Sequence, residues 1–352
     1  MKNIQNFYKN KKVLVTGHTG FKGSWLAFTL YNFGSKVYGY GLKPKSKFSN
    51  FKSLKLDKKI VNYFADIRDE KKVLNFINKI KPDIIFHLAA QSLVKQSYKD
   101  PSYTIQTNIN GTLNILKYAL KSSNLGSLLI ITSDKCYKNK EKISGYNEKD
   151  ELGGSDPYSA SKASAEIVSH AFLKSYFYKN KKLGVATARA GNVIGGGDWS
   201  QDRVIPDFVK SIKFKKNFYL RSPKAIRPWQ HVFDVLNGYL LLGKKIYKNN
   251  SFNGSWNFGP NNKNLLKVIQ IINFIKKEIK SDKKIFIKKQ KEFQETKTLV
   301  LNSSKTKKKL LWKSKYSIKK ALMVTSNWYQ CFLTNKDLYS ISLQQFKNYF
   351  FK

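Results

Sequence analysis

A glycine-rich turn directly after the first apolar strand constrains this sequence more than any other feature. Residues 13–23 read Val-Leu-Val-Thr-Gly-His-Thr-Gly-Phe-Lys-Gly, a strand pattern that runs into G-x-x-G-x-x-G. Glycines let the backbone approach a dinucleotide pyrophosphate, whose charge then meets the N-terminus of the following helix. The turn predicts a cofactor site whose candidate residues are Gly17, His18, Thr19, Gly20, Phe21, Lys22 and Gly23.

Short apolar runs alternate with helical patterns up to about residue 190. Strands are predicted at 13–16, 36–40, 60–64, 84–88, 128–132 and 184–188, and helices begin near Gly20, Asp69, Tyr103 and Pro157. Apolar strands separated by helices indicate a parallel sheet that is covered on both faces. The prediction is therefore an α/β fold, a Rossmann doubly wound parallel sheet with a smaller mixed α/β substrate lobe.

The second half of the chain loses this regular alternation. Helices are predicted near 204–213, 232–244, 265–277 and 318–330, with a strand near 255–258. We expect an NAD-binding Rossmann domain over 1–190 and a substrate lobe over 191–352, with 230–260 returning to the Rossmann sheet. Residues 334–352 form an aromatic, basic tail to which the sequence assigns no element.

The chain of 352 residues carries 66 Lys and Arg against 22 Asp and Glu, a formal net charge of +44. Such a charge favours phosphate backbones through counterion release, so an RNA-binding or scaffold protein is the non-enzyme alternative. The cations are 61 Lys and only 5 Arg, spread through nearly every segment. This spread favours a genome biased toward lysine codons, and we expect no nucleic-acid partner.

Two cysteines, Cys136 and Cys331, are too few for a disulfide framework or a cysteine-rich zinc site. We expect no metal. No run approaches the roughly 18 apolar residues of a membrane helix, and residues 1–10 lack a signal-peptide pattern. We therefore expect a soluble cytoplasmic protein without a membrane partner.

Tyr158 and Lys162 form a Y-x-x-x-K pair one helical turn apart. The spacing occurs four times in the chain, about as often as chance predicts, so context decides. Tyr158 follows Pro157 at a predicted helix start, between the fifth and sixth strands. A neighbouring ammonium lowers the pKa of a phenol, which lets tyrosine act as a base, so both residues are candidates for catalysis and cofactor binding.

Ser133, Asp134 and Lys135 follow the fifth predicted strand. Ligands of parallel sheets bind at the carboxyl ends of the strands, so the pair of Asp134 and Lys135 is predicted to point into the cofactor cleft. A surface salt bridge or a helix cap is the structural alternative. The second strand ends in Tyr40-Gly41-Leu42-Lys43 without the acidic residue typical of NAD sites, and Lys43 also suits a 2′-phosphate. Asp66 and Ile67 are the candidate adenine contacts, with a capping aspartate as the alternative.

With 86–91 (FHLAAQ), 190–199 (AGNVIGGGDW) and 226–232 (IRPWQHV), these motifs resemble the CDP-glucose 4,6-dehydratases, which are extended short-chain dehydrogenases. The resemblance runs from Lys11 to Leu322. It implies bound NAD and conversion of CDP-D-glucose to CDP-4-keto-6-deoxy-D-glucose and water. The steps would be oxidation at C4, loss of water across C5 and C6, and return of the hydride to C6.

The resemblance also implies individual roles. Tyr158 would deprotonate the C4 hydroxyl, which Ser133 would hold, while Asp134 would be the acid toward the C6 hydroxyl and Lys135 the C5 base. Additional cofactor contacts would be Leu88, Ala89, Ala90 and Thr107. The substrate contacts would be Gln91, Asn192, Arg203, Arg227 and His231. A homodimer or homotetramer that supplies deoxysugars for lipopolysaccharide O-antigen would complete the expectation.

Four of the five arginines fall within one window, at Arg189, Arg203, Arg221 and Arg227. The forked guanidinium binds phosphate through two hydrogen bonds, so the window predicts the diphosphate site, with ion pairs of the fold as the alternative. His87 and His170 are expected to pack within the fold. Relatives tend to carry Asp in place of Asn302, which leaves contacts of the substrate lobe open.

Three further readings stay open. A 4,6-dehydratase of a UDP-, dTDP- or GDP-linked sugar would use the same residues. A nucleotide-sugar 4-epimerase would share Tyr158 and Lys162, but Asp134 and Lys135 argue against it. The RNA-binding alternative predicts salt-sensitive binding and no turnover.

Overall fold

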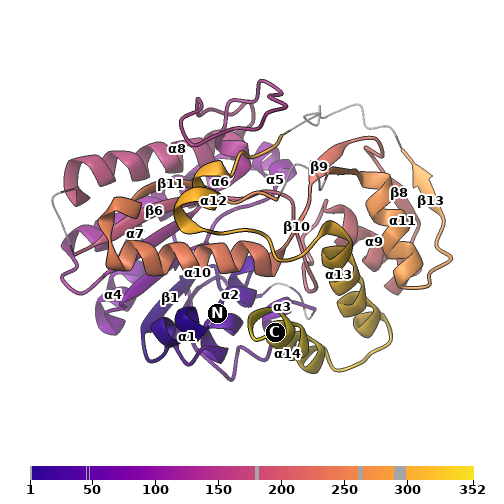
Figure 1. Cartoon of the computed structure of the whole chain (residues 1–352), viewed down its shortest axis with the longest axis horizontal. Coiled ribbons are helices and arrows are strands. Elements are labelled where there is room, and N and C mark those ends of the chain that lie inside the picture. The colour runs from indigo at the N-terminus through magenta and orange to yellow at the C-terminus, as the bar shows by residue number, and fades with distance from the viewer. Residues whose placement is uncertain (1, 45, 47, 179–181, 261–264, 289–298) are drawn as a thin grey trace.

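A computed structural model describes residues 2–44, 46, 48–178, 182–260, 265–288 and 299–352. Its central sheet has seven parallel strands in the order β11-β6-β5-β4-β1-β2-β3 (Figure 1). The strands are β1 (Lys12–Thr16), β2 (Lys36–Gly41), β3 (Val61–Phe64), β4 (Ile84–His87), β5 (Ser127–Ile131), β6 (Gly184–Arg189) and β11 (Gly254–Asn257). The six predicted strands and the doubly wound fold are confirmed.

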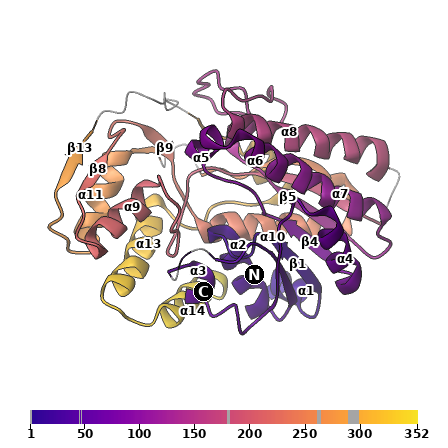
Figure 2. The ribbon, with the colours of Figure 1, turned by 180° about the vertical axis from the view of Figure 1, so that it is seen from behind.

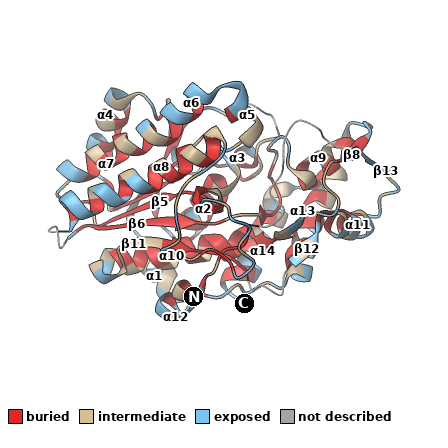
Figure 3. Ribbon diagram, turned by 90° about the horizontal axis from the view of Figure 1, so that it is seen from above, coloured by how far each residue is buried: buried red, intermediate tan, exposed pale blue. Residues whose placement is uncertain are grey.

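Helices cover both faces of this sheet (Figures 2 and 3). One face carries α4 (Glu70–Ile80), α7 (Gly111–Lys121) and α8 (Pro157–Phe172), and the other carries α2 (Phe21–Asn32) and α10 (Val232–Lys248).

Alternation along the strands supplies both cores. Successive side chains of a strand point to opposite faces, so Leu14 joins one core with Val73, while Val13 and Val15 join the other with Leu236. The near-continuous apolar strands of the sequence follow from this burial on both sides.

The β1–α2 turn requires its glycines. Gly17 has φ +70°, and a Cβ there would lie 2.7 Å from the backbone nitrogen of Ala89. A Cβ on Gly23 would overlap the carbonyl oxygen of Gly17. The close packing brings the N-terminus of α2 against the carboxyl ends of β1 and β4.

The second lobe consists of helices and three two-stranded sheets beside one end of the large sheet (Figure 1). Its elements are β7 (Val193–Ile194), α9 (Val204–Lys213), β8 (Phe218–Leu220), β9 (Ile226–Pro228), β10 (Gln230–His231), β12 (Leu265–Lys267), α11 (Val268–Glu278), β13 (Ile285–Ile287) and α13 (Ile318–Leu333). The helices predicted near 204, 232 and 318 are confirmed. The one predicted at 265–277 begins at Val268, because 265–267 form β12.

Shorter elements connect these parts of the chain. They are α1 (Lys2–Tyr8), α3 (Asn50–Ser53), α5 (Val94–Lys99), α6 (Pro101–Ile105), α12 (Ser304–Leu310), π-helical turns at Gln106–Asn110 and Leu173–Phe177, and 3₁₀ turns at Asp134–Cys136 and Asn250–Phe252. Among the described residues, no helix is long and apolar enough to cross a membrane.

The chain returns from the second lobe to the sheet twice. First, α10 packs on the sheet and β11 pairs with β6. The tail without a predicted element then forms α14 (Leu338–Phe350), whose Phe346 ring lies 5.8 Å from Phe28 and 5.9 Å from Phe33 of the α2 region. The two halves of the chain therefore interleave, and the boundary at residue 190 stays a prediction.

Candidate active site

A cavity of about 1130 Å³ opens between the carboxyl ends of the strands and the second lobe. Its wall comes from the β1–α2 turn, the ends of β4 and β5, the start of α8 and the segments 190–207 and 217–222. Single-ligand pockets usually measure about 300–1000 Å³, so this cavity has room for a cofactor and a second molecule.

The glycine turn offers a cradle for the pyrophosphate of a dinucleotide. Gly20 caps α2 without any side-chain hydrogen bond, and a Cβ built there would have no neighbour closer than 3.4 Å, on Gly17. The first amides of the helix therefore point toward open space. Thr107 Oγ1 lines the same cavity, is buried and has no hydrogen-bond partner in the described structure. These donors and this open backbone fit NAD.

Other predicted cofactor residues occupy the same side of the cavity. These are Gly17, Thr19, Phe21, Lys22, Gly23, Asp66, Ile67, Leu88, Ala89 and Ala90. Burial would raise the pKa of Asp66, but hydrogen bonds from Arg68 outweigh it and hold this pKa below its usual value. A charged carboxylate thus lies after β3, in place of the acidic residue that the end of β2 lacks.

His18 is the exception among the residues of the turn. The structure buries it completely, outside the cavity lining, with its ring 5.4 Å from that of Phe51 and 5.8 Å from that of Phe64. Burial lowers its pKa to about 4, so the ring is neutral at pH 7. The His18 ring therefore packs beneath the turn and does not line the cavity, and a contact of His18 with the cofactor stays a prediction.

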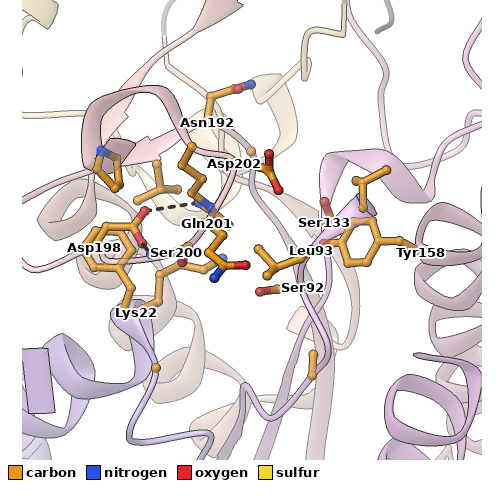
Figure 4. Close-up of a pocket in the computed structure, with 18 of the residues that line it drawn as sticks. Lys22, Ser92, Leu93, Ser133, Tyr158, Asn192, Asp198, Ser200, Gln201 and Asp202 are labelled. Carbon is orange, nitrogen blue, oxygen red and sulfur yellow. Dashed lines mark hydrogen bonds and ion pairs between the residues drawn. The ribbon is translucent and has the colours of Figure 1, made fainter. Parts of the chain in front are cut away.

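The structure brings the five candidate catalytic residues to one wall of the cavity. Ser133 caps the 3₁₀ turn after β5 through its Oγ, which accepts a hydrogen bond from the backbone of Lys135, and donates to Asp134 Oδ1 at 2.9 Å. Asp156 caps α8, which places Tyr158 and Lys162 on its first turns. Figure 4 shows Ser133 beside Tyr158, the pair that a hydrogen bond joins.

The pKa of the tyrosine differs from the sequence prediction. Burial raises the pKa of Tyr158 to about 12, although the hydrogen bond with Ser133 and the charge of Arg203 act in the opposite direction. Burial also lowers the pKa of Lys162 to about 8, and its Nζ donates to the carbonyl of Ile131 at 3.3 Å. Burial therefore dominates the pKa of Tyr158, in place of the acidifying effect that the sequence predicted for the lysine.

The opposite wall comes from the second lobe. Three of the residues predicted to contact the substrate, Asn192, Arg203 and Arg227, line the cavity. The guanidinium of Arg203 lies 3.5 Å from the carboxylate of Asp198. The carboxylate of Asp202 forms ion pairs with Lys95 of α5 at 2.8 Å and with Arg221 at 2.9 Å. This ion-pair cluster joins the two walls (Figure 4 shows Asp202).

Sequence reasoning did not select Lys95, Asp198 or Asp202. Only Asp198 had a visible signal, because it directly follows the glycine run at 195–197.

Three residues assigned to the substrate site or its arginine window lie outside the lining. Gln91 bonds Thr104 Oγ1 at 2.9 Å and the backbone of Leu93, so it fixes its own loop. His231 is buried and caps α10, and burial lowers its pKa to about 3. Arg189 forms a buried ion pair with Glu166 at 2.7 Å. In each case the side chain forms a hydrogen bond or an ion pair within the protein interior.

The two histidines that were expected to pack within the fold differ in the structure. His87 is buried between Thr16 Oγ1 at 2.8 Å and Thr112 Oγ1 at 3.2 Å, which confirms its packing role, whereas His170 is exposed, so that expectation is wrong. Asn302 accepts a hydrogen bond from the backbone of Ser304 and does not line the cavity. Both cysteines are free, and no metal-binding group of three or more ligands occurs in the described part of the chain.

Sequence comparison agrees with this geometry. A family described as "GDP-mannose 4,6 dehydratase" matches residues 14–325. The chain belongs to this family. Among curated relatives of this dehydratase-family protein, the CDP-glucose 4,6-dehydratase of Salmonella typhimurium is 38% identical over 98% of both chains. The dTDP-D-glucose 4,6-dehydratase of Dictyostelium discoideum is 29% identical over 74% of this chain and 61% of the relative.

Solved structures show the same fold. A UDP-glucose 4-epimerase from Thermotoga maritima has a TM-score of 0.80 at 24% identity and covers 92% of this chain and 99% of its own. A dTDP-glucose 4,6-dehydratase from Bacillus anthracis in complex with NAD has a TM-score of 0.75 at 22% identity, with 94% and 99% covered. The dehydratase family and the epimerases therefore share one architecture.

Proposed function

We propose that this dehydratase-family protein is an NAD-dependent carbon-oxygen lyase that converts CDP-D-glucose to CDP-4-keto-6-deoxy-D-glucose and water. The observation that carries the proposal is the end-to-end likeness to a CDP-glucose 4,6-dehydratase. The cavity adds the chemistry that such a reaction needs, because an acid and an amine lie beside the Tyr158 and Lys162 pair.

In the first step the sugar is oxidised at C4. Bound NAD supplies a hydride acceptor that later returns the hydride, so the reaction consumes no oxidant. Tyr158 accepts the proton of the C4 hydroxyl, and Ser133 orients that hydroxyl. The phenol must ionise for this role, and cations such as Arg203 lower its pKa from the value that burial imposes.

The elimination then uses the strand-end pair. The C4 ketone makes the C5 proton acidic, and Lys135 removes it in its amine form. Asp134 donates a proton to the C6 hydroxyl, which leaves as water while a C5–C6 double bond forms. A cofactor held at the glycine turn would supply the hydride that C6 needs, and a proton at C5 would complete the 6-deoxy sugar.

The nucleotide part is expected to occupy the second lobe. Arg203 and Arg227 line the cavity where a diphosphate would lie, and Asn192 stands at the same wall. Guanidinium groups bind phosphate oxygens through two parallel hydrogen bonds, which a lysine cannot form. This explains why a lysine-rich chain keeps arginine there.

The test incubates purified protein with CDP-glucose and, in parallel, with UDP-, dTDP- and GDP-glucose, each with and without added NAD. The 4-keto product is followed by its absorbance in alkali and by the loss of one water in the mass spectrum. Turnover on CDP-glucose is expected. Turnover on another nucleotide sugar alone would identify that sugar as the substrate in place of CDP-glucose. A C4-inverted hexose formed without loss of water would indicate an epimerase.

Epimerisation is the second candidate, because UDP-glucose 4-epimerases occur among both the relatives and the structural neighbours. The placement of Asp134 and Lys135 in the cavity wall disfavours it, since inversion at C4 needs no acid and base for C5 and C6. A cytoplasmic location, a homodimer or homotetramer and a place in O-antigen deoxysugar synthesis remain part of the proposal. The two free thiols suit a reducing compartment.

A further inference from the structure

A lysine side chain stands inside the glycine turn, although the turn needs only glycines to bind a pyrophosphate. Lys22 is the second residue of α2, lines the cavity and is half-buried there. The charged groups that face it are Arg203 and Lys162, which repel it, and Asp134 and Asp198, which attract it. A cation in this place requires an anionic partner to stay charged.

Asp198 comes from the second lobe and is held rigidly opposite the turn. Its side chain is buried, with Oδ1 accepting from the backbone of Ser200 at 3.0 Å and Oδ2 3.5 Å from Arg203. Its carbonyl accepts from Tyr329 at 2.7 Å. Figure 4 shows its carboxylate on the side of the cavity where Lys22 lies.

A direct contact joins the two elements that carry Lys22 and Asp198. Trp25, one turn after Lys22 on α2, donates its Nε1 hydrogen to the carbonyl of Gly196 at 2.9 Å. A Cβ on Gly196 would overlap Trp328, so the backbone of this loop sits against α13 without room to move away. The helix of the cofactor turn and the 195–198 loop are thus fixed to each other.

We propose that Asp198 is a positioning residue that keeps the Lys22 ammonium charged against the cofactor diphosphate and so locks the cofactor between both halves of the protein. The inference rests on the NAD assignment of the proposed function. It suits a reaction that returns its cofactor unchanged, since one bound cofactor can then serve many turnovers.

The protonation of Lys22 gives the proposal a distinctive pH dependence. Burial and the charges of Arg203 and Lys162 lower the pKa of Lys22 to about 7. Diphosphate stabilises the charged amine, so binding of NAD weakens as the pH rises above this value. Asp198 raises the pKa of Lys22, and its loss moves the weakening to lower pH.

The experiment titrates full-length protein with NAD by calorimetry, without sugar, at half-unit steps from pH 5.5 to 9. Asp198→Asn keeps the shape of the side chain and its acceptor for Ser200 while removing the charge. If the pKa of Lys22 falls by about one unit, NAD binding weakens about fivefold at pH 7 and less than twofold at pH 5.5. Lys22→Met is expected to bind weakly with a flat pH profile.

The matched control is Asp150→Asn, the same change at a carboxylate that lies outside the cavity lining and pairs with Lys142 instead. It should keep the wild-type pH profile of NAD binding. An equal loss at every pH in Asp198→Asn would overturn the inference, as would a wild-type pH profile in Lys22→Met. Wild-type protein that binds no NAD would instead defeat the cofactor assignment itself.

Discussion

Lys135 is the residue on which the elimination depends most directly, because no other candidate supplies a base at the end of β5. We expect Lys135→Gln to lower turnover of CDP-glucose at least ~100-fold, the range of a lost general base. The KM should change little, since the side chain acts on C5 and not on the nucleotide. Rates of 4-keto product formation measure both.

Lys138→Gln is the control for this variant. Lys138 lies three residues further along, is exposed and pairs with Glu151 at 2.7 Å. Its turnover should stay within about twofold of wild type, because exposed ion pairs contribute little. A Lys135→Gln enzyme with wild-type turnover would transfer the role of base to another group.

Glu166 anchors buried polar groups from three strands. Its carboxylate accepts from Thr132 at the end of β5, from Thr187 and Arg189 of β6 and from Ser255 of β11. The pair with Arg189 is almost fully buried. Glu166→Gln leaves the guanidinium without a counter-charge, so we expect the free energy of unfolding at pH 7 to fall by about 3–5 kcal/mol. Urea denaturation gives this difference.

The pH dependence of this effect has a defined sign. Burial would raise the pKa of Glu166, but Arg189 and the hydroxyl groups outweigh it and leave this pKa lowered. The stabilisation is therefore present above the unfolded-state pKa of about 4.3 and is lost as the pH falls through the folded-state value. Glu151→Gln, at an exposed carboxylate, should leave the urea midpoint at pH 7 unchanged.

The sequence predicts which residues stand near the cavity, but it does not predict whether their side chains face the cavity or the protein interior. Ser133 and Tyr158 follow a strand end and a helix cap, and the topology of a parallel sheet alone places such positions at the cavity. Gln91 follows β4 and Arg189 is the last residue of β6, yet Thr104 and Glu166 bind them in the interior. Those partners are distant in sequence, so no local pattern reveals them.

At the scale of the element, the β1–α2 turn allows its cofactor role to be separated from its folding role. We expect Gly20→Ala to keep the melting temperature, because the new methyl group meets nothing closer than 3.4 Å, while it obstructs the pyrophosphate cradle. Gly23→Ala should lower the melting temperature and reduce the yield of folded protein, since its methyl group overlaps the backbone of Gly17. Thermal melts and NAD titrations distinguish the two.

An equal loss of stability in both variants would contradict this division. Normal NAD binding in Gly20→Ala would show that the cofactor does not approach the turn as closely as proposed.

The elements themselves follow from sequence to different degrees. The buried strands and α9, α10 and α13 carry apolar patterns strong enough to predict. The helix α14 does not, because aromatic residues stand on several sides of it. Contacts with residues distant in sequence, among them Phe28 and Phe33, decide which face is buried. The short strands of the second lobe depend in the same way on partners elsewhere in the chain.

For the whole molecule, the charge of +44 acts as a general self-repulsion in the folded state. We expect the melting temperature to rise between 10 and 300 mM sodium chloride at pH 7, because screening shortens the reach of this repulsion from about 30 Å to below 10 Å. Differential scanning calorimetry measures the effect. A flat or falling melting temperature would mean that the attractive pairs of the fold outweigh the repulsion.

The contact between α14 and α2 also has a consequence for the folding of the nascent chain. The helix that carries the cofactor turn is made among the first 32 residues, yet its outer face is covered by residues up to Phe350. A nascent chain on the ribosome therefore lacks the cover of Phe28 and Phe33 until α14 has been made, and the cofactor half completes this part of its core only when residue 350 has left the exit tunnel. Chaperones that shield exposed aromatic surface would therefore have the interval between the synthesis of α2 and that of α14 in which to act.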